Sequence, residues 1–65
     1  MNNVEIFDKI FGEVSVVHNC EEWYEVFDSE LMDEVNEKIC KYFGVENACD
    51  IEGYSNWYDE MYWDL

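Results

Sequence analysis

The segment that decides the fold most clearly is residues 29–44, with the sequence SELMDEVNEKICKYFG. Leu31, Val35 and Ile39 recur every four residues, which places them on one side of a helix. Tyr42 and Phe43 extend the same apolar stripe by one turn. We therefore predict a central amphipathic helix over residues 29–43, with this stripe facing the core.

The charges and ends of this segment favour the same helix. Asp28 or Ser29 is suited to cap its start, and Gly44 stands where a left-handed residue usually ends a helix. Acidic residues fill the first turns, whereas Lys38 and Lys41 lie near the end, so that the charges oppose the helix macrodipole. Each lysine of the chain also follows a glutamate by four residues, which predicts the helical ion pairs Glu5–Lys9, Glu34–Lys38 and Glu37–Lys41.

Upstream, residues 3–11 predict a short first helix. Its apolar stripe is Val4, Phe7, Ile10 and Phe11. Asn2 or Asn3 is suited to the N-cap, and Gly12 stands at the expected C-terminal stop.

The sequence then changes character. Residues 13–18 read EVSVVH and residues 22–27 read EWYEVF, two β-favouring runs around a short polar break. This pattern predicts an antiparallel hairpin. The second run also fits a helix, because Trp23, Val26 and Phe27 have helical spacing.

The last third supports two interpretations. Ser55 is suited to cap a helix over residues 56–64 that stacks Trp57 on Met61 and Tyr58 on Tyr62. The same residues alternate as a strand would, although Asp59 on the apolar strand face favours the helix. The predicted fold is a single α+β domain over residues 1–65: a short N-terminal helix, a β-hairpin, the central helix and a C-terminal aromatic helix or strand.

The net charge is the most unusual property of the chain. It has 65 residues, 17 Asp or Glu, three Lys and no Arg, for a formal charge of −14. So many carboxylates would repel phosphates, which excludes direct nucleic-acid binding. The three Trp, five Tyr and four Phe are untypical of disorder, so we expect a folded protein whose stability depends on salt. No apolar run is long enough for a membrane helix and no secretory leader is present, so a cytoplasmic location is expected.

The sequence does not predict a catalytic site or a metal site. Cys20, Cys40 and Cys49 are an odd set without the paired knuckles of a zinc site, so we expect reduced thiols and neither metal nor cofactor. His18 with these cysteines is the alternative metal set. The same residues are the only candidate Cys–His nucleophile pair, and acidic surroundings disfavour the thiolate it needs, so no enzyme is expected.

The acidic residues form two groups without an intervening lysine, which we take as the candidate partner-binding residues. The first group is Glu21, Glu22, Glu25, Asp28, Glu30 and Asp33, and the second is Glu46, Asp50, Glu52, Asp59, Glu60 and Asp64. Three rings interleaved with the second group, Trp57, Tyr58 and Tyr62, are the candidate anchors. A net charge of roughly 2 to 8 is enough to keep a small domain soluble, so −14 exceeds that need.

The charge density is comparable to that of DNA. Duplex DNA carries one charge per roughly 1.7 Å, so fourteen charges span about 24 Å of it. A 65-residue domain has a radius of gyration of about 11 Å and a diameter of roughly 28 Å. The protein can match the charge density of DNA only if its carboxylates gather on one face.

In size, charge and aromatic content the chain resembles the small acidic DNA-mimic inhibitors of phages and mobile elements, which include anti-CRISPR proteins, anti-restriction proteins and uracil-DNA glycosylase inhibitors. The stretch Ile51-Glu52-Gly53-Tyr54 is similar to acidic, tyrosine-containing stretches of anti-restriction proteins. The resemblance implies an inhibitor that occupies the nucleic-acid-binding surface of a host defence nuclease, with an anti-CRISPR protein favoured. The alternative is an acidic interaction module that masks the basic surface of a toxin, restriction enzyme or transcription factor. A homodimer stays open.

Overall fold

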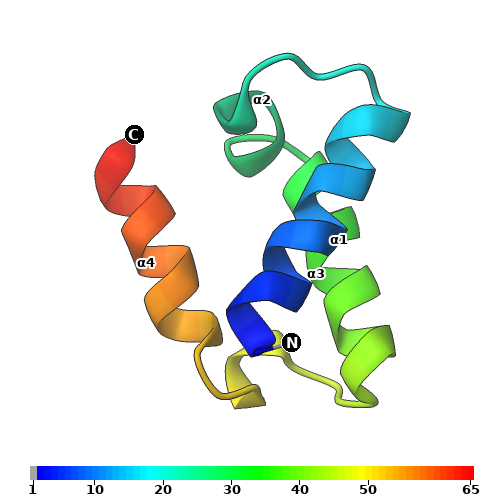
Figure 1. The fold of residues 1–65 in the computed structure, drawn as a ribbon, viewed down its shortest axis with the longest axis vertical. Helices are drawn as coiled ribbons and strands as arrows, with labels where there is room; N and C mark the ends of the chain where they lie inside the picture. The colour runs from blue at the N-terminus through cyan, green and yellow to red at the C-terminus, as the bar shows by residue number, and fades with distance from the viewer. Residues whose placement is uncertain (1) are drawn as a thin grey trace.

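The computed structural model describes residues 2–65, and these residues form a bundle of helices (Figure 1). The elements in chain order are α1 (Asn3–Val17), α2 (Trp23–Phe27), α3 (Leu31–Phe43), the 3-10 turn η1 (Ala48–Asp50) and α4 (Tyr54–Asp64). No strand occurs within residues 2–65, so the predicted α+β class and its β-hairpin are wrong. Helices α1 and α3 run antiparallel, and α4 lies along the other side of α1.

Helix α1 does not stop at Gly12. Its N-cap is Asn2, one of the two predicted candidates, whose Oδ1 accepts a hydrogen bond of 2.9 Å from the backbone N–H of Glu5. It then continues to Val17 because Phe7, Ile10 and Val14 are all buried on one side. A glycine inside a helix costs roughly 0.5–1 kcal/mol, whereas burying a valine side chain contributes about 1.5–3 kcal/mol. Core burial therefore outweighs both the glycine and the β-branched run of residues 13–18.

The second half of the expected hairpin is the short helix α2, as the helical alternative had it. Val26 and Phe27 lie in the core on one side of this single turn. The carboxylate of Glu25 accepts hydrogen bonds from the backbone N–H groups of Glu21 at 2.7 Å and Glu22 at 3.0 Å. Residues 19–22 therefore form the connection between two helices, with Asn19 in the left-handed region at φ 56°.

Helix α3 confirms the prediction for the central helix. Gly44 ends it in the left-handed conformation at φ 71°, and Val35 and Ile39 are fully buried. The hydroxyl of Ser29 accepts a hydrogen bond from the backbone N–H of Leu31 at 3.1 Å, near the expected cap. Tyr42 does not belong to the buried stripe, because it is 66% exposed.

Helix α4 settles the ambiguity of the last third in favour of the helix. It begins at Tyr54 directly after Gly53, which has φ 89°, rather than at a cap provided by Ser55. Its first turns reach the core, where Trp57 and Tyr54 pack around Phe7 with ring centroids 5.2 and 5.7 Å away. The predicted size is confirmed by a radius of gyration of 11.0 Å and extents of 28 × 24 × 22 Å.

Candidate protein-binding surface

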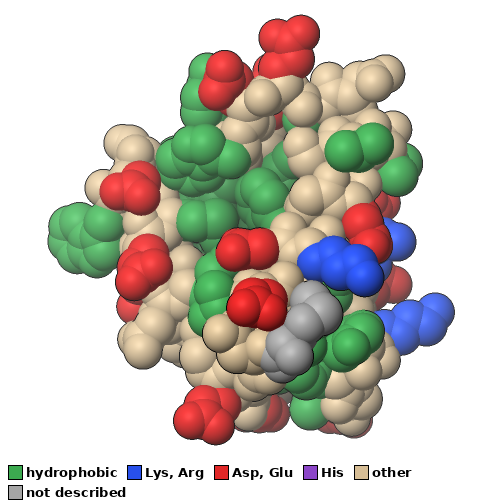
Figure 2. Space-filling view, viewed as in Figure 1, with side chains coloured by type: hydrophobic (Ala, Val, Ile, Leu, Met, Phe, Trp, Pro, Cys, Tyr) green, Lys and Arg blue, Asp and Glu red, His purple; other side chains and the backbone are tan. Residues whose placement is uncertain are grey.

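The acidic side chains are almost all available to solvent. Every Asp and Glu is exposed except Glu34, which is half-buried. They project from every helix and from the connections between them, so the expectation that they gather on one face is not met. Their arrangement is nevertheless uneven, because the three lysines belong to α1 and α3 alone and appear on one side of the view in Figure 2.

Nine of the twelve predicted acidic residues lie toward one end of the molecule. The first acidic group surrounds α2, and the C-terminal half of α4 extends toward the same end (Figure 1). The two elements meet where the rings of Phe27 and Tyr58 pack with centroids 4.9 Å apart. We call this surface the α2–α4 face; its acidic residues are Glu21, Glu22, Glu25, Asp28, Glu30, Asp33, Asp59, Glu60 and Asp64.

The structure separates the other three predicted acids from this face. Glu46, Asp50 and Glu52 lie in and around η1, between α3 and α4, at the opposite end of the molecule (Figure 1). They are exposed as well. Because they lie far from the α2–α4 face, they provide a control for any effect of charge alone.

The rings of α4 divide between the core and the surface. Trp57 is 6% exposed and its indole Nε1 donates a hydrogen bond to Asp8 Oδ1 at 2.9 Å, so it is a core residue rather than an anchor for a partner. Tyr58 is half-buried against α2. Tyr62 is 58% exposed, as an anchor must be, and Trp63 is 82% exposed.

Trp63 is a candidate site residue that the sequence reasoning missed. A helix that starts at Tyr54 turns Trp57 into the core and packs Tyr58 and Met61 against its edge, which leaves Tyr62 and Trp63 on the exposed side. The interleaving of acids and rings was visible in the sequence, but the choice of ring depends on the helical phase. In Figure 2, hydrophobic groups lie in the hollow beside α4, and acidic groups surround them.

Not every acid on the α2–α4 face is free to meet a partner. Glu25 already accepts two backbone hydrogen bonds at the start of α2, so part of its role is structural. Elsewhere, Glu34 Oε2 lies 3.0 Å from His18 Nε2, a contact that joins the end of α1 to α3. It is the only contact within 4.0 Å between a basic and an acidic side chain among residues 2–65, so the expected Glu–Lys pairs are not formed.

The cysteines and His18 do not assemble into a site. The Cys20 thiol donates a long hydrogen bond of 3.9 Å to the backbone carbonyl of His18. The imidazole of His18 is instead hydrogen-bonded to Glu34. Within the described residues 2–65, no group of three or more His, Cys, Asp or Glu side chains is placed to hold a metal ion. The structure therefore does not bring His18 and the three cysteines together as one set of ligands within residues 2–65.

We compared the chain with models of known protein families, with curated proteins and with solved structures. None of the three comparisons found a match.

None of the helices in residues 2–65 combines the length and the apolar character needed to cross a membrane.

Tyr54, at the start of α4, has a raised pKa. Burial, followed by the nearby Cys49, Tyr58 and Cys40, raises the pKa of Tyr54 to about 12, although a hydrogen bond from its hydroxyl to Asn36 opposes the rise. Tyr54 therefore anchors the start of α4 as a neutral phenol.

Proposed function

We propose that the protein is a stoichiometric inhibitor that occupies the cationic nucleic-acid-binding groove of another protein through its α2–α4 face. The observation that carries this proposal is the C-terminal half of α4. There, the exposed Tyr62 and Trp63 stand among Asp59, Glu60 and Asp64, with no lysine nearby along the chain.

The charge on the molecule is similar to that of the DNA segment that such a groove binds. Duplex DNA as long as the 28 Å extent of the protein would carry about 16 charges. The protein carries −14 over that length. Although its acids are not confined to one face, the positive charge is confined to α1 and α3, so the α2–α4 face offers a cationic partner an anionic surface without local cations.

The two kinds of side chain have separate tasks in this proposal. The carboxylates raise the rate of encounter and then pair with Arg and Lys of the target. The rings supply the contact area: an exposed Trp or Tyr that becomes buried in an interface is a typical hot spot, and Trp63 has nearly its whole side chain available. Arg side chains of a nucleic-acid groove also stack on such rings.

The proposal is tested by competition with DNA. A CRISPR effector nuclease, a restriction endonuclease and a uracil-DNA glycosylase are the first targets, because these are the partners of the inhibitors that the chain resembles. Each is mixed with a labelled cognate DNA and with increasing amounts of the protein. We expect one of them to release its DNA at about one equivalent of inhibitor, and the complex to weaken as salt is raised.

Matched variants separate site-specific charge from total charge. The triple variant Asp59→Asn, Glu60→Gln, Asp64→Asn and the triple variant Glu46→Gln, Asp50→Asn, Glu52→Gln each remove three negative charges. We expect the first to weaken inhibition at least about tenfold and the second to change it far less. Equal losses in both would mean that the α2–α4 face is not the binding site.

The same competition distinguishes DNA mimicry from a masking module. A target that binds DNA and the protein simultaneously contradicts occupation of the groove. If Trp63→Ala abolishes binding while the α4 triple variant has no effect, binding depends on the aromatic rings and not on the carboxylates. That result would contradict DNA mimicry.

A further inference from the structure

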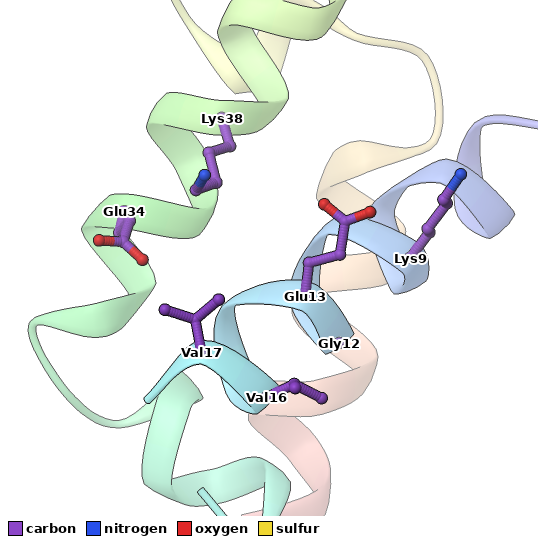
Figure 3. A pocket seen from close by; sticks show the side chains of 7 residues that line it. All are labelled: Lys9, Gly12, Glu13, Val16, Val17, Glu34 and Lys38. Carbon is purple, nitrogen blue, oxygen red and sulfur yellow. The ribbon is translucent and has the colours of Figure 1, made fainter. Parts of the chain in front are cut away.

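A groove between α1 and α3 lies away from the α2–α4 face. It has a volume of about 740 Å³ and is lined by residues of α1 from Lys9 onward and by Glu34 and Lys38 of α3 (Figure 3). Val16 and Val17 form its apolar part and are 77% and 75% exposed. Lys9 of α1 and Lys38 of α3 also line it. Its volume is within the range of pockets that bind organic ligands.

Gly12 lines this groove. It stands inside α1, and nothing lies within 4 Å of the place where its side chain would begin. Neither steric crowding nor an unusual backbone angle requires glycine there, although glycine costs the helix roughly 0.5–1 kcal/mol compared with alanine. The consequence of this glycine is extra room on the groove wall.

The lining of the groove carries no net formal charge, in a chain whose total charge is −14. Its two lysines balance Glu13 and Glu34, and Glu34 is in contact with His18. None of the three lysines of the chain lies within 4.0 Å of a carboxylate in residues 2–65, so Lys9 and Lys38 are free to pair with an outside acid. An occupant that combines an apolar ring with carboxylates matches both parts of the groove.

The chain itself contains such an occupant. In residues 59–65, Trp63 is the most exposed ring, and Glu60 and Asp64 are three residues before it and one after it. Helical spacing places Glu60 and Asp64 on neighbouring turns, about 5–6 Å apart at Cβ. A molecule cannot place this segment in its own groove, because α4 lies on the opposite side of α1 from α3 (Figure 1).

We propose that the α1–α3 groove binds the C-terminal half of α4 from a second copy of this chain, with Trp63 over Val16 and Val17 and the flanking carboxylates near Lys9 and Lys38. The contact joins two different surfaces, so each pair leaves one groove and one α4 end free to extend the assembly. It also covers the C-terminal half of α4 in one copy, so that this copy cannot bind its target while the contact lasts.

Salt affects this contact in the opposite direction from target binding. Two copies of charge −14 repel each other at long range, and salt screens that repulsion while leaving the apolar contact in place. We therefore expect self-association to strengthen from about 0.05 M to about 1 M NaCl. The interface is small, so it is measured by sedimentation velocity at concentrations up to about 1 mM.

Two complementary variants test the geometry. Trp63→Ala removes the ring but keeps the groove, and Val16→Glu places a charge in the groove but keeps the ring. Each is expected to weaken self-association at least about tenfold. An equimolar mixture is expected to form a dimer of one copy of each and nothing larger, because only one intact groove and one intact ring remain to meet. Tyr42→Ala removes an exposed ring outside both surfaces and is the control that keeps assembling.

The outcomes are distinct from those of the proposed function. A wild-type protein that is monomeric at every salt and concentration overturns the inference, and so does a mixture of the two variants that stays monomeric. A symmetric dimer that persists in both variants alone overturns it as well. Inhibition of a target by Val16→Glu at the wild-type level shows that the α2–α4 face works without the groove, whichever way the assembly experiment ends.

Discussion

Gly12 and Gly44 are two glycines with opposite effects on stability. Gly12 lies inside α1 with open space around it, so Gly12→Ala is expected to raise the free energy of unfolding by about 0.5–1 kcal/mol. Gly44 ends α3 at φ 71°, where an alanine is strained, so Gly44→Ala is expected to lower it by about 1–2 kcal/mol. Urea unfolding of the two variants checks both signs, and a loss of stability in Gly12→Ala would contradict the open position.

Tyr54 makes the stability depend on pH in the alkaline range. Its pKa is raised from 10.0 to about 12 in the folded protein, so the unfolded chain loses the phenolic proton first. The contribution of Tyr54 is therefore intact below pH 10 and is lost as the pH rises from 10 to about 12. Denaturant unfolding between these pH values measures it. Tyr54→Phe is the control, and its stability should fall less over the same interval.

At the scale of the elements, α2 depends on one carboxylate. Glu25 satisfies two backbone N–H groups at the start of a helix of only five residues. Glu25→Ala is expected to cost about 1 kcal/mol and to increase amide exchange in residues 21–27. Glu30→Ala removes the same charge from an exposed residue whose side chain makes no capping hydrogen bond, and it should cost less. Equal costs would mean that charge, rather than capping, sets the effect.

The elements also show what the sequence can predict. Helix α3 follows from its own residues, because its stripe, its charges and Gly44 agree. The second half of α1 does not: Val-Ser-Val-Val favours a strand locally, and the position of Val14 in the core decides otherwise. In the same way, the phase of α4 selects Trp57 for the core and leaves Trp63 outside. The acidic and aromatic character of the candidate surface was predictable, whereas the separation of Glu46, Asp50 and Glu52 from the other predicted acids depends on packing.

The molecule as a whole is expected to gain stability from salt. A charge of −14 within extents of 28 × 24 × 22 Å repels itself, and the Debye length falls from about 10 Å at 0.1 M to about 3 Å at 1 M salt. Relief of about 1 kcal/mol would raise the melting temperature of a domain of this size by about 4–8 °C. Circular dichroism melts at low protein concentration, where copies do not associate, measure this effect. A melting temperature that does not change with salt would contradict it.

The three tryptophans occupy three different environments: Trp57 is enclosed, Trp23 is half-covered and Trp63 is nearly bare. Intrinsic fluorescence therefore reports on separate regions of one small protein without any added dye. Acrylamide, which is neutral, reaches Trp63 most readily, whereas iodide is held away by the negative field around the molecule. Shielding of Trp63 from acrylamide, with Trp57 emission unchanged, would indicate that a target protein or a second copy has bound at the end of α4.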